Sequence, residues 1–248
     1  MESVIEIRDL FHAYGAGKKK WEALRGITLT VKKGGIFGFL GPNGAGKTTT
    51  IKLLLGILTP QIGTLSVFGG IPAIPRTRMK IGYMPEIADY YRYLTPGELL
   101  YMYGDIFGID RKILTGRINE LLEMVGISES AGRQMRTFSR GMKQKVSFAQ
   151  ALINDPDLLI LDEPTGGLDP IARKKMREVM ISLRDKNKTV FFSSHELSEV
   201  ELVSDRVAIL NKGRVLKEGL LSGFLSAKGE KQTLEGYFLE IIEGSEKG

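Results

Sequence analysis

The sequence predicts an α/β fold with a parallel sheet at its centre, antiparallel strands at its start and helices inserted in its middle. Strand-like and helix-like segments alternate after residue 154, as a doubly wound parallel sheet requires. Helical patterns fill 88–153, and alternating apolar residues precede them. With 248 residues, 42% of them hydrophobic, the chain is long enough to bury one large core. We therefore expect a single domain in which 1–87 and 154–227 form the core with a β subdomain, 88–153 form a helical subdomain, and 228–248 form a C-terminal segment.

The first elements are expected to be antiparallel strands that lead into a buried strand. Apolar and polar residues alternate before a turn at 33–35, and the apolar ones are Ile27, Leu29 and Val31. The short apolar run Ile36–Leu40 suits a buried strand, and Leu65 and Val67 predict another short strand.

Residues 41–48 read GPNGAGKT and match the phosphate-binding loop G-x-x-x-x-G-K-[ST] at every fixed position. The glycines let backbone N–H groups turn inward and form an anion-binding nest. Lys47 adds a mobile cation for the β and γ phosphates, and the Thr48 hydroxyl is a hard oxygen ligand for Mg²⁺. A helix is expected over 46–58, so that phosphate would lie at a helix N-terminus; its apolar face would be Ile51, Leu54, Leu55 and Leu58.

This motif predicts that the chain binds a nucleoside triphosphate on the core of a P-loop NTPase (RecA-like). Both the strand before the loop and the helix after it support the assignment. The residues expected to contact the nucleotide here are Gly41, Pro42, Asn43, Gly44, Ala45, Gly46, Lys47, Thr48 and Thr49.

Helices are expected in the middle segment over Pro96–Phe107 and Ile113–Val125, the second ending at Gly126. Beyond the insertion, strands are expected at 158–161, 189–193 and 207–210, helices at 170–186 and 197–203, and a hairpin turn at 211–213 before a strand at 214–217. From Lys228 the chain mixes charges with apolar residues, which fits either a small docking helix or a frayed tail; the apolar residues are Tyr237, Phe238, Leu239, Ile241 and Ile242.

Two carboxylates follow the apolar strand at 158–161, at the edge of the sheet where open α/β folds bind ligands. Asp162 suits Mg²⁺ held through water. Glu163 is the expected general base, because hydrolysis needs a carboxylate beside the γ-phosphate to orient and deprotonate water.

With these motifs in view, the chain resembles the nucleotide-binding subunit of an ATP-binding cassette (ABC) transporter over essentially its whole length. Residues 138–142, FSRGM, followed by KQK, resemble the family's signature sequence. Residues 166–169, GGLD, resemble the loop that follows the second nucleotide motif, and Asp169 is placed to cap the helix begun by Pro170. The resemblance implies ATP and Mg²⁺ as the ligands.

Single residues also take roles from the resemblance. His195 resembles the switch histidine that contacts the γ-phosphate, and Tyr14 resembles the aromatic residue that stacks on adenine. Residues 18–21 resemble a small insertion, so competition between Trp21 and Tyr14 for the adenine stays open. Glu86 falls where the family usually has glutamine, at the start of the loop facing the transmembrane partner, and it is a candidate Mg²⁺ ligand. The implied catalytic residues are Glu163, His195 and Lys47, and the implied metal ligands are Thr48, Asp162 and Glu86.

The resemblance further implies that ATP is bound between two chains. Ser139 and Gly141 of the signature would form a second anion site that faces the phosphate loop of another chain. Each motif occurs once, so a complete site would need two chains head to tail, either two copies or this chain and a paralogue. Arg140 and Met142 replace the commoner glycine and glutamine, a version found among exporters; Arg140 either lends its charge to the γ-phosphate or faces solvent.

Composition bounds the surroundings of the protein. The absence of cysteine excludes disulfides and thiolate metal sites, and two histidines are too few for a histidine-rich metal site. The start of the chain lacks the features of a secretory signal, and no run approaches the roughly 18 apolar residues of a membrane span. We expect a chain that is soluble by itself, in a reducing compartment, peripheral on the cytoplasmic face of the membrane and bound to a transmembrane permease.

Three functions follow from these observations. The favoured one is an ATPase whose dimer closes and opens to drive a membrane subunit, with export as the favoured direction. The second is a soluble ABC-type ATPase acting on DNA or ribosomes, which would carry long coiled coils or two cassettes in one chain. The net charge of +6 does not by itself choose a partner, but no aromatic residues interleave with basic ones to stack bases, so nucleic acid is not expected. The third is a binding module without hydrolysis, disfavoured by the complete set of Lys47, Asp162, Glu163 and His195.

Overall fold

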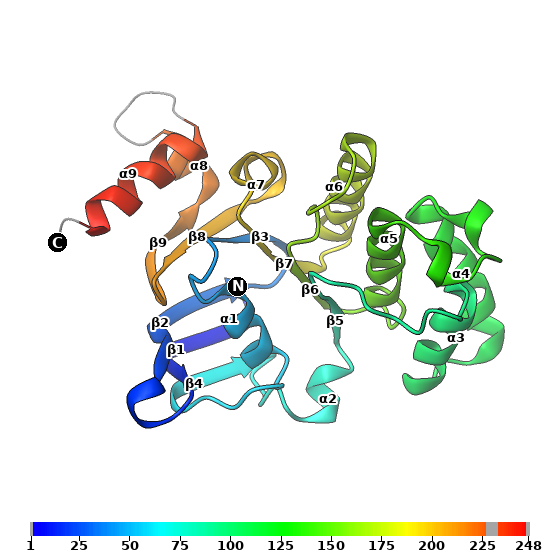
Figure 1. The fold of residues 1–248 in the computed structure, drawn as a ribbon, viewed down its shortest axis with the longest axis horizontal. Helices are drawn as coiled ribbons and strands as arrows, with labels where there is room; N and C mark the ends of the chain where they lie inside the picture. Colours follow the sequence, from blue (N-terminus) through cyan, green and yellow to red (C-terminus); the bar gives the residue numbers. More distant parts are fainter. Residues whose placement is uncertain (1, 227–232, 247–248) are drawn as a thin grey trace.

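A six-stranded sheet forms the centre of the protein, shown in Figure 1 as a computed structural model that describes residues 2–226 and 233–246. The strand order is β5-β6-β7-β3-β8-β9. The first five strands in this order are parallel, and β9 joins β8 in an antiparallel hairpin. The bounds are β3 (Gly35–Leu40), β5 (Ile81–Met84), β6 (Leu158–Asp162), β7 (Thr189–Ser194), β8 (Arg206–Asn211) and β9 (Arg214–Leu220). The predicted parallel core is confirmed.

A second, antiparallel sheet packs against one face of the first. Its order is β2-β1-β4, with β1 (Ser3–Tyr14), β2 (Trp21–Lys32) and β4 (Ile62–Val67), and the short turn η1 (Gly17–Lys19) links β1 to β2. Helix α1 (Lys47–Leu54) shares a buried cluster with both sheets, in which Leu29, Ile51 and Phe191 meet. Because side chains alternate across a strand, Phe37 and Phe39 face this cluster while Ile36 and Leu40 face the other side.

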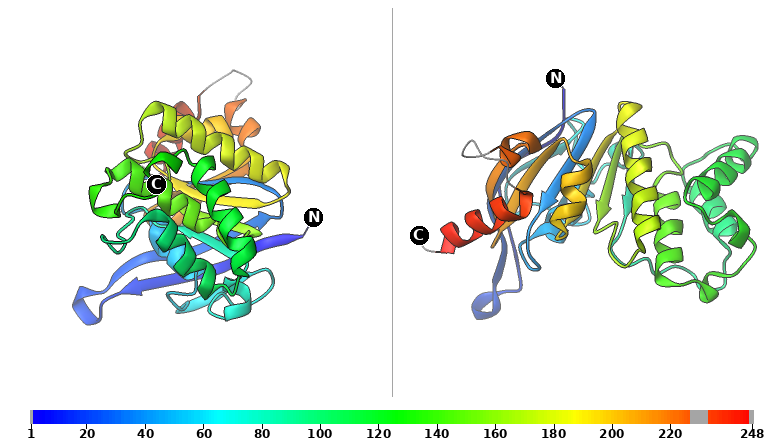
Figure 2. Two further views of the ribbon diagram at one scale, coloured as in Figure 1. Left: turned by 90° about the vertical axis from the view of Figure 1, so that its right-hand side faces the viewer. Right: turned by 90° about the horizontal axis from the view of Figure 1, so that it is seen from above.

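Two helices cover the opposite face of the central sheet, as the views in Figure 2 show. They are α6 (Pro170–Asp185) and α7 (Leu197–Val203), whose Met180 and Val200 are buried against Val190 and Phe192 of β7. Asp169 caps α6 by accepting a hydrogen bond from the Ala172 amide at 2.9 Å, as its position before Pro170 predicts.

The inserted helices form the end of the molecule next to β5 and β6 (Figure 1). They are α3 (Pro96–Ile106), α4 (Arg111–Met124) and α5 (Arg140–Ala151), with short turns η2 (Ser128–Ser130) and η3 (Met135–Thr137) between the last two. Thr95 and Glu98 form a capping box at the start of α3, and Ser139 caps α5 by accepting from the Met142 amide at 3.2 Å. The two helices predicted in this segment are confirmed.

The C-terminal helix docks on the core. After α8 (Leu221–Leu225), helix α9 (Leu234–Glu246) contacts α7, with Leu234 fully buried and its amide donating to Glu201 Oε2 at 2.9 Å. Of the two interpretations of the C-terminal segment, the docking helix is confirmed for 234–246. Residue 227 of the expected core and residues 228–232 and 247–248 of the expected C-terminal segment lie outside the described residues.

One predicted helix was too long, and one strand was missed. The helix expected over 46–58 ends at Leu54, because Gly56 has a left-handed φ of 64° and closes a Schellman motif in which the Ile57 amide donates to Lys52 O at 2.9 Å. Leu58 therefore lies beyond the helix, half-buried against the same core. The short strand β5 was not predicted from the sequence. It contains Gly82, where a Cβ would lie 1.9 Å from Ala151 O, so that glycine permits the close packing of α5 on this strand.

Candidate nucleotide-binding site

The predicted site residues follow neighbouring strands of the central sheet. The phosphate loop follows β3, His195 follows β7, and Asp162 and Glu163 lie at the end of β6; these three strands are adjacent in the order β6-β7-β3. Glu86 lies two residues after β5, the neighbour of β6 on its other side. Parallel strands end at one edge of the sheet, so the topology brings these segments together.

Backbone geometry requires glycine at two positions of the phosphate loop. Gly46 has φ 111° and forms the N-cap of α1, and Gly41 lies so close to β8 that a Cβ would be 2.4 Å from Leu210 O. Side chains at these positions would strain the turn or clash. The loop therefore leaves the free N–H groups at the start of α1 open to an anion, as the motif predicts.

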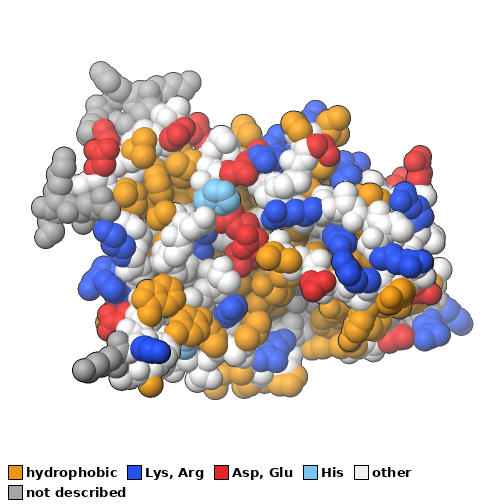
Figure 3. All heavy atoms as spheres, in the orientation of Figure 1, with side chains coloured by type: hydrophobic (Ala, Val, Ile, Leu, Met, Phe, Trp, Pro, Cys, Tyr) orange, Lys and Arg blue, Asp and Glu red, His pale blue; other side chains and the backbone are white. Residues whose placement is uncertain are grey.

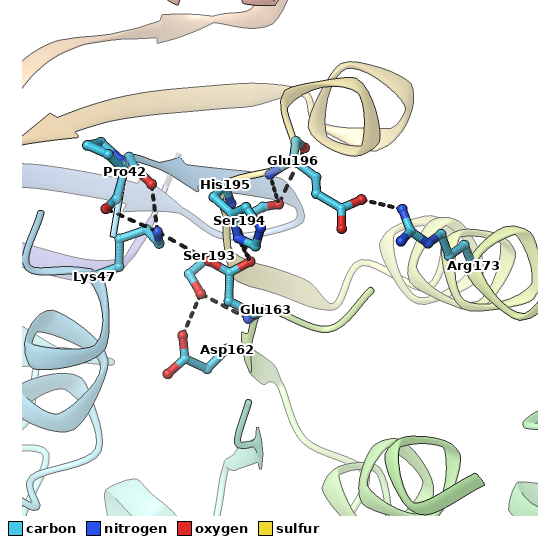
Figure 4. A network of polar contacts seen from close by, with 10 residues as sticks. Pro42, Lys47, Asp162, Glu163, Arg173, Ser193, Ser194, His195 and Glu196 are labelled. Atoms are coloured by element: carbon cyan, nitrogen blue, oxygen red, sulfur yellow. Dashed lines mark hydrogen bonds and ion pairs between the residues drawn. The ribbon is translucent and has the colours of Figure 1, made fainter. Parts of the chain in front are cut away.

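Lys47 is buried, and its side chain points toward Glu163 (Figure 4). Its Nζ donates to Gly41 O at 2.6 Å and lies 3.2 Å from Glu163 Oε1. Both side chains are about nine-tenths buried, so this ion pair is shielded from water and salt. The predicted phosphate-binding cation and the predicted general base are thus in direct contact.

Asp162 is held by hydroxyl groups at the floor of the site. Ser193 Oγ donates to Asp162 Oδ1 at 2.6 Å and accepts from the Glu163 amide at 3.0 Å, so one serine fixes both acids. Burial raises the pKa of Asp162 above its usual value, while the hydrogen bonds from Ser193 and Thr48 oppose that shift and the charges of Glu163 and Glu86 add to it. Burial, with the charges of Asp162 and Glu86, raises the pKa of nearby Tyr83 to about 12. A cation at this position would therefore be stabilised by the negative charge around it.

Glu163 adopts a left-handed backbone conformation with φ 50°, an uncommon geometry for a residue other than glycine. Its Oε2 is 2.8 Å from His195 Nδ1 and accepts from the His195 amide at 3.3 Å. The histidine ring remains half exposed. Glu163 thus lies between Lys47 and His195, with one carboxylate oxygen on each, which suits a base that orients water beside a phosphate.

A cavity of about 240 Å³ opens onto these groups. In Figure 3 acidic side chains and a histidine lie side by side near the centre of this face, with basic side chains around them. Trp21, half exposed at the start of β2, lines this cavity, and Tyr14 does not. The residues lining the cavity are Trp21, Pro42, Asn43, Gly44, Gly46, Lys47, Thr48, Thr49, Glu86, Glu163 and His195.

The two candidate adenine-stacking residues are stacked on each other. The rings of Tyr14 and Trp21 are 6.0 Å apart and nearly parallel at 16°, and the Tyr14 hydroxyl is 3.4 Å from Thr49 Oγ1. Tyr14 thus contacts two residues that line the cavity, Trp21 and Thr49, without lining it itself. From the sequence, Trp21 was considered only as a competitor of Tyr14 for the adenine. Its position at the cavity depends on the connection between β1 and β2, which no local pattern predicts. Ser193 was also missed, although a serine at the carboxyl end of an apolar strand is a recognisable signal.

The signature segment lies apart from this cavity. Ser139 and Gly141 are among the described residues but do not line it. Instead the start of α5 packs against the loop at 166–169: a Cβ on Gly141 would be 3.5 Å from the Leu168 side chain, and one on Gly167 would be 3.1 Å from Arg140 Nε. Arg140 thus lies over Gly167 and directs no charge into the cavity of its own chain.

The residues present fit a magnesium ion. Thr48 and Glu86 line the cavity, and Asp162 is hydrogen-bonded to Thr48, so hard oxygen donors meet beside the phosphate loop. Within residues 2–226 and 233–246, no three His, Asp or Glu side chains are grouped as a metal site. In nucleotide sites Mg²⁺ is usually held by one or two protein oxygens together with phosphates and water, and Thr48, Asp162 and Glu86 offer such oxygens.

Comparison with known proteins decides the family. The sequence model described as ABC transporter matches residues 24–166, more than half of the chain. The chain belongs to this family. An uncharacterized ABC transporter ATP-binding protein of Nostoc sp. is 45% identical over 91% of this chain and 69% of its own length. The Nod factor export ATP-binding protein I of Cupriavidus metallidurans is 38% identical over 88% of this chain and 72% of its own length.

Solved structures agree with this family. The structure of an ATP-binding subunit of an ABC transporter aligns with a TM-score of 0.87 and 31% identity, over 96% of this chain and 99% of that one. A dimeric structure of MJ0796, a bacterial ABC transporter cassette, aligns with a TM-score of 0.81 and 26% identity, over 89% and 100% of the two chains. This member of the ABC family is therefore an ATPase that binds and hydrolyses ATP, as the phosphate loop and the two acids predict. None of the helices within the described residues has the length and apolar character needed to cross a membrane.

Proposed function

We propose that this ABC cassette energises a membrane transporter, with ATP clasped between two cassettes and hydrolysed to reset them. The observation that carries the proposal is the separation of the two halves of the site. Lys47, Glu163 and His195 converge on one cavity, whereas Ser139 and Gly141 lie on another part of the same chain. A second chain in head-to-tail orientation would supply the missing half, and the similar MJ0796 cassette is known as a dimer.

In this proposal each residue has one role. Lys47 and the loop amides bind the β and γ phosphates. Thr48, Asp162 and Glu86 hold Mg²⁺, which neutralises phosphate charge when bound. Glu163 orients and deprotonates the attacking water, and His195 contacts the γ-phosphate. Trp21, supported by Tyr14, stacks on the adenine.

The membrane role of the cassette is supported by its relatives. The Nod factor protein to which the chain is similar is named for export, and the altered signature at Arg140 and Met142 favours the same direction. The cassette would then bind a transmembrane permease at the cytoplasmic face of the membrane and move it as the dimer closes and opens.

Light scattering on the Glu163→Gln variant tests the shared site. At saturating ATP and Mg²⁺ we expect a dimer, because ATP binds while its hydrolysis is slowed, and a monomer with ADP. A mass that stays monomeric with ATP would contradict the shared site.

Co-purification of the wild-type chain with a polytopic membrane protein tests the transport role. Salt-sensitive binding to DNA in place of such a partner would favour a soluble DNA-directed ATPase.

A further inference from the structure

Arg173, near the start of α6, links two loops of the site, and Figure 4 shows its contact with one of them, at Glu196. Its Nε donates to the main-chain oxygen of Leu168 at 3.0 Å. Its Nη1 pairs with the carboxylate of Glu196, the residue after His195. The guanidinium thus holds the loop at 166–169 and the turn that carries His195 at the same time.

The turn that carries His195 is short and closed by hydrogen bonds. The Glu196 amide donates to Ser194 Oγ at 2.9 Å, and the Ser194 hydroxyl donates to Glu196 O at 3.3 Å. Because these bonds enclose His195, a displacement of Glu196 would move the imidazole. Such a movement would lengthen the 2.8 Å contact between His195 Nδ1 and Glu163 Oε2.

The loop at 166–169 begins three residues after the proposed general base, Glu163, and leads directly into α6. The Gly166 amide donates to Glu163 O at 3.2 Å, and Gly167 and Leu168 pack against Arg140 and Gly141 of the signature. One side of this loop therefore touches the segment expected to face the partner chain. Arg173 connects its other side to Glu196, and through Glu196 to His195.

Residue chemistry favours arginine for this link. The side chains of Arg173 and Glu196 are 27% and 26% exposed, so their pairing is partly shielded from water. A planar guanidinium presents several N–H donors in fixed directions, which lets it serve a carbonyl and a carboxylate together, whereas lysine offers one point charge. Arg177, one turn later, has a similar exposure of 21% and pairs with Glu199 Oε2 at 2.7 Å, but among the described contacts it reaches neither Leu168 nor Glu196.

We propose that Arg173 is a positioning residue for ATP hydrolysis, setting His195 against Glu163 and tying this pair to the loop beside the signature. The proposal rests on the functions proposed above for Glu163 and His195. Arg173 does not line the nucleotide cavity, so its loss should slow turnover and leave ATP affinity in place.

Steady-state ATPase kinetics of Arg173→Met and Arg177→Met test this role, since both variants remove an arginine that pairs with a glutamate of the 196–199 segment. For Arg173→Met we expect kcat to fall by about ten- to hundredfold, the scale of a small misplacement of catalytic groups, with KM for ATP changed by less than about twofold. For Arg177→Met both constants should stay within about twofold of wild type. Glu196→Gln should lower kcat in the same direction but by no more than Arg173→Met, and the double variant should lose no more than Arg173→Met alone, because the Glu196 change acts through the ion pair that Arg173→Met already removes.

Three results would overturn the proposal: equal losses in the two arginine variants, a loss carried by KM, or losses of Arg173→Met and Glu196→Gln that multiply in the double variant. If Arg173→Met does not fold, as judged by its thermal unfolding, the milder Glu196→Gln is compared with Arg177→Met on the same criteria. Failure of the proposed function is seen separately, since it would appear as undiminished turnover in Glu163→Gln.

Discussion

The Nζ atom of Lys47 lies 3.2 Å from Oε1 of Glu163, in a pair that is nearly buried. The ammonium that the phosphate-loop motif assigns to the β and γ phosphates is therefore also bound by the carboxylate assigned to activate water. Lys47 already donates to Gly41 O, so phosphate oxygens must compete with Glu163 for its remaining N–H groups. Binding of ATP and release of the base for catalysis are thus linked through one lysine.

Replacing Glu163 by glutamine should separate affinity from turnover. The amide keeps the shape of the side chain but removes the negative charge that holds Lys47 and repels phosphate, so ATP should bind severalfold more tightly. Turnover should fall by at least roughly a hundredfold, the usual scale for losing a general base. Equilibrium binding and steady-state ATPase assays measure the two quantities.

Glu178→Gln serves as the control for this change. Glu178 is an exposed acid that pairs with Lys174 on the surface of α6, so its removal alters the net charge equally without touching the site. We expect wild-type affinity and turnover from it. Undiminished turnover in Glu163→Gln would remove this residue from the role of base.

Trp21 should report directly on the nucleotide. It is the only tryptophan in the chain and lines the cavity, so stacking of adenine on its ring should quench the intrinsic fluorescence. Trp21→Ala should weaken ATP binding by about tenfold or more, the scale of a lost base-stacking contact. Trp21→Phe should restore most of the affinity, because it keeps an aromatic face.

Two controls separate the base from the phosphates in this experiment. Inorganic tripolyphosphate carries no base, so it should leave the Trp21 fluorescence largely unchanged and bind Trp21→Ala as well as wild type. Tyr14→Phe removes only the hydroxyl near Thr49 and should change ATP affinity by less than about twofold. A large loss of ATP affinity in Tyr14→Ala with none in Trp21→Ala would return the stacking role to Tyr14.

We expect the ionised Asp162 carboxylate to destabilise the folded protein when neither magnesium nor nucleotide is bound. Burial raises its pKa in the folded protein, so the ionised carboxylate is less favourable there than in the unfolded chain. Asp162→Asn should therefore raise the unfolding temperature at neutral pH in the absence of magnesium and nucleotide, and abolish ATP turnover. The stability gain should be complete well above the raised pKa and disappear as the pH falls through it toward the unfolded value, because the wild-type acid then becomes neutral as well.

Thermal unfolding across a pH series measures this difference. Asp157→Asn is the matched control for Asp162→Asn. Asp157 directly precedes β6, is half exposed and pairs with Lys188. This substitution should change the unfolding temperature little at any pH. An Asp162→Asn variant that is less stable than wild type at neutral pH would show that the hydrogen bonds from Ser193 and Thr48 outweigh the cost of burial.

The sequence predicted the central sheet, the helical insertion and the phosphate site because each has a local signal. A glycine-rich loop between an apolar strand and an amphipathic helix, and two acids after an apolar strand, need no tertiary information. The end of the first helix at Gly56 and the strand Ile81–Met84 escaped prediction, since the first depends on a left-handed turn and the second on pairing with β6. The place of Trp21 at the cavity and the link from Arg173 to Glu196 depend on which loops the fold brings together, which no local pattern records.

Mixing two inactive variants tests whether the signature acts on the partner's ATP. Gly141→Asp fits sterically, because a Cβ there would make only ordinary contact with Leu168 at 3.5 Å, but it places a carboxylate where the partner's phosphates are expected. Alone, Gly141→Asp and Glu163→Gln should each be nearly inactive, since every site in either homodimer carries a defect. In a mixed dimer both defects fall on one site, and the other site combines an intact Glu163 with an intact signature.

An equal mixture should therefore recover activity, up to roughly a quarter of wild type if the chains exchange freely and the two sites of each dimer work independently. The ATPase activity of wild-type chain alone, at the same total concentration, is the reference. A mixture of Glu163→Gln with Asp162→Asn is the control. In that control both changes belong to the same half of the site, so each site of the mixed dimer keeps one defect and no recovery is expected. Absence of recovery from the Gly141→Asp mixture, when light scattering shows that mixed dimers form, would show that the signature serves ATP bound to its own chain. Recovery in the control would show instead that Asp162 and Glu163 of one chain do not serve the same ATP.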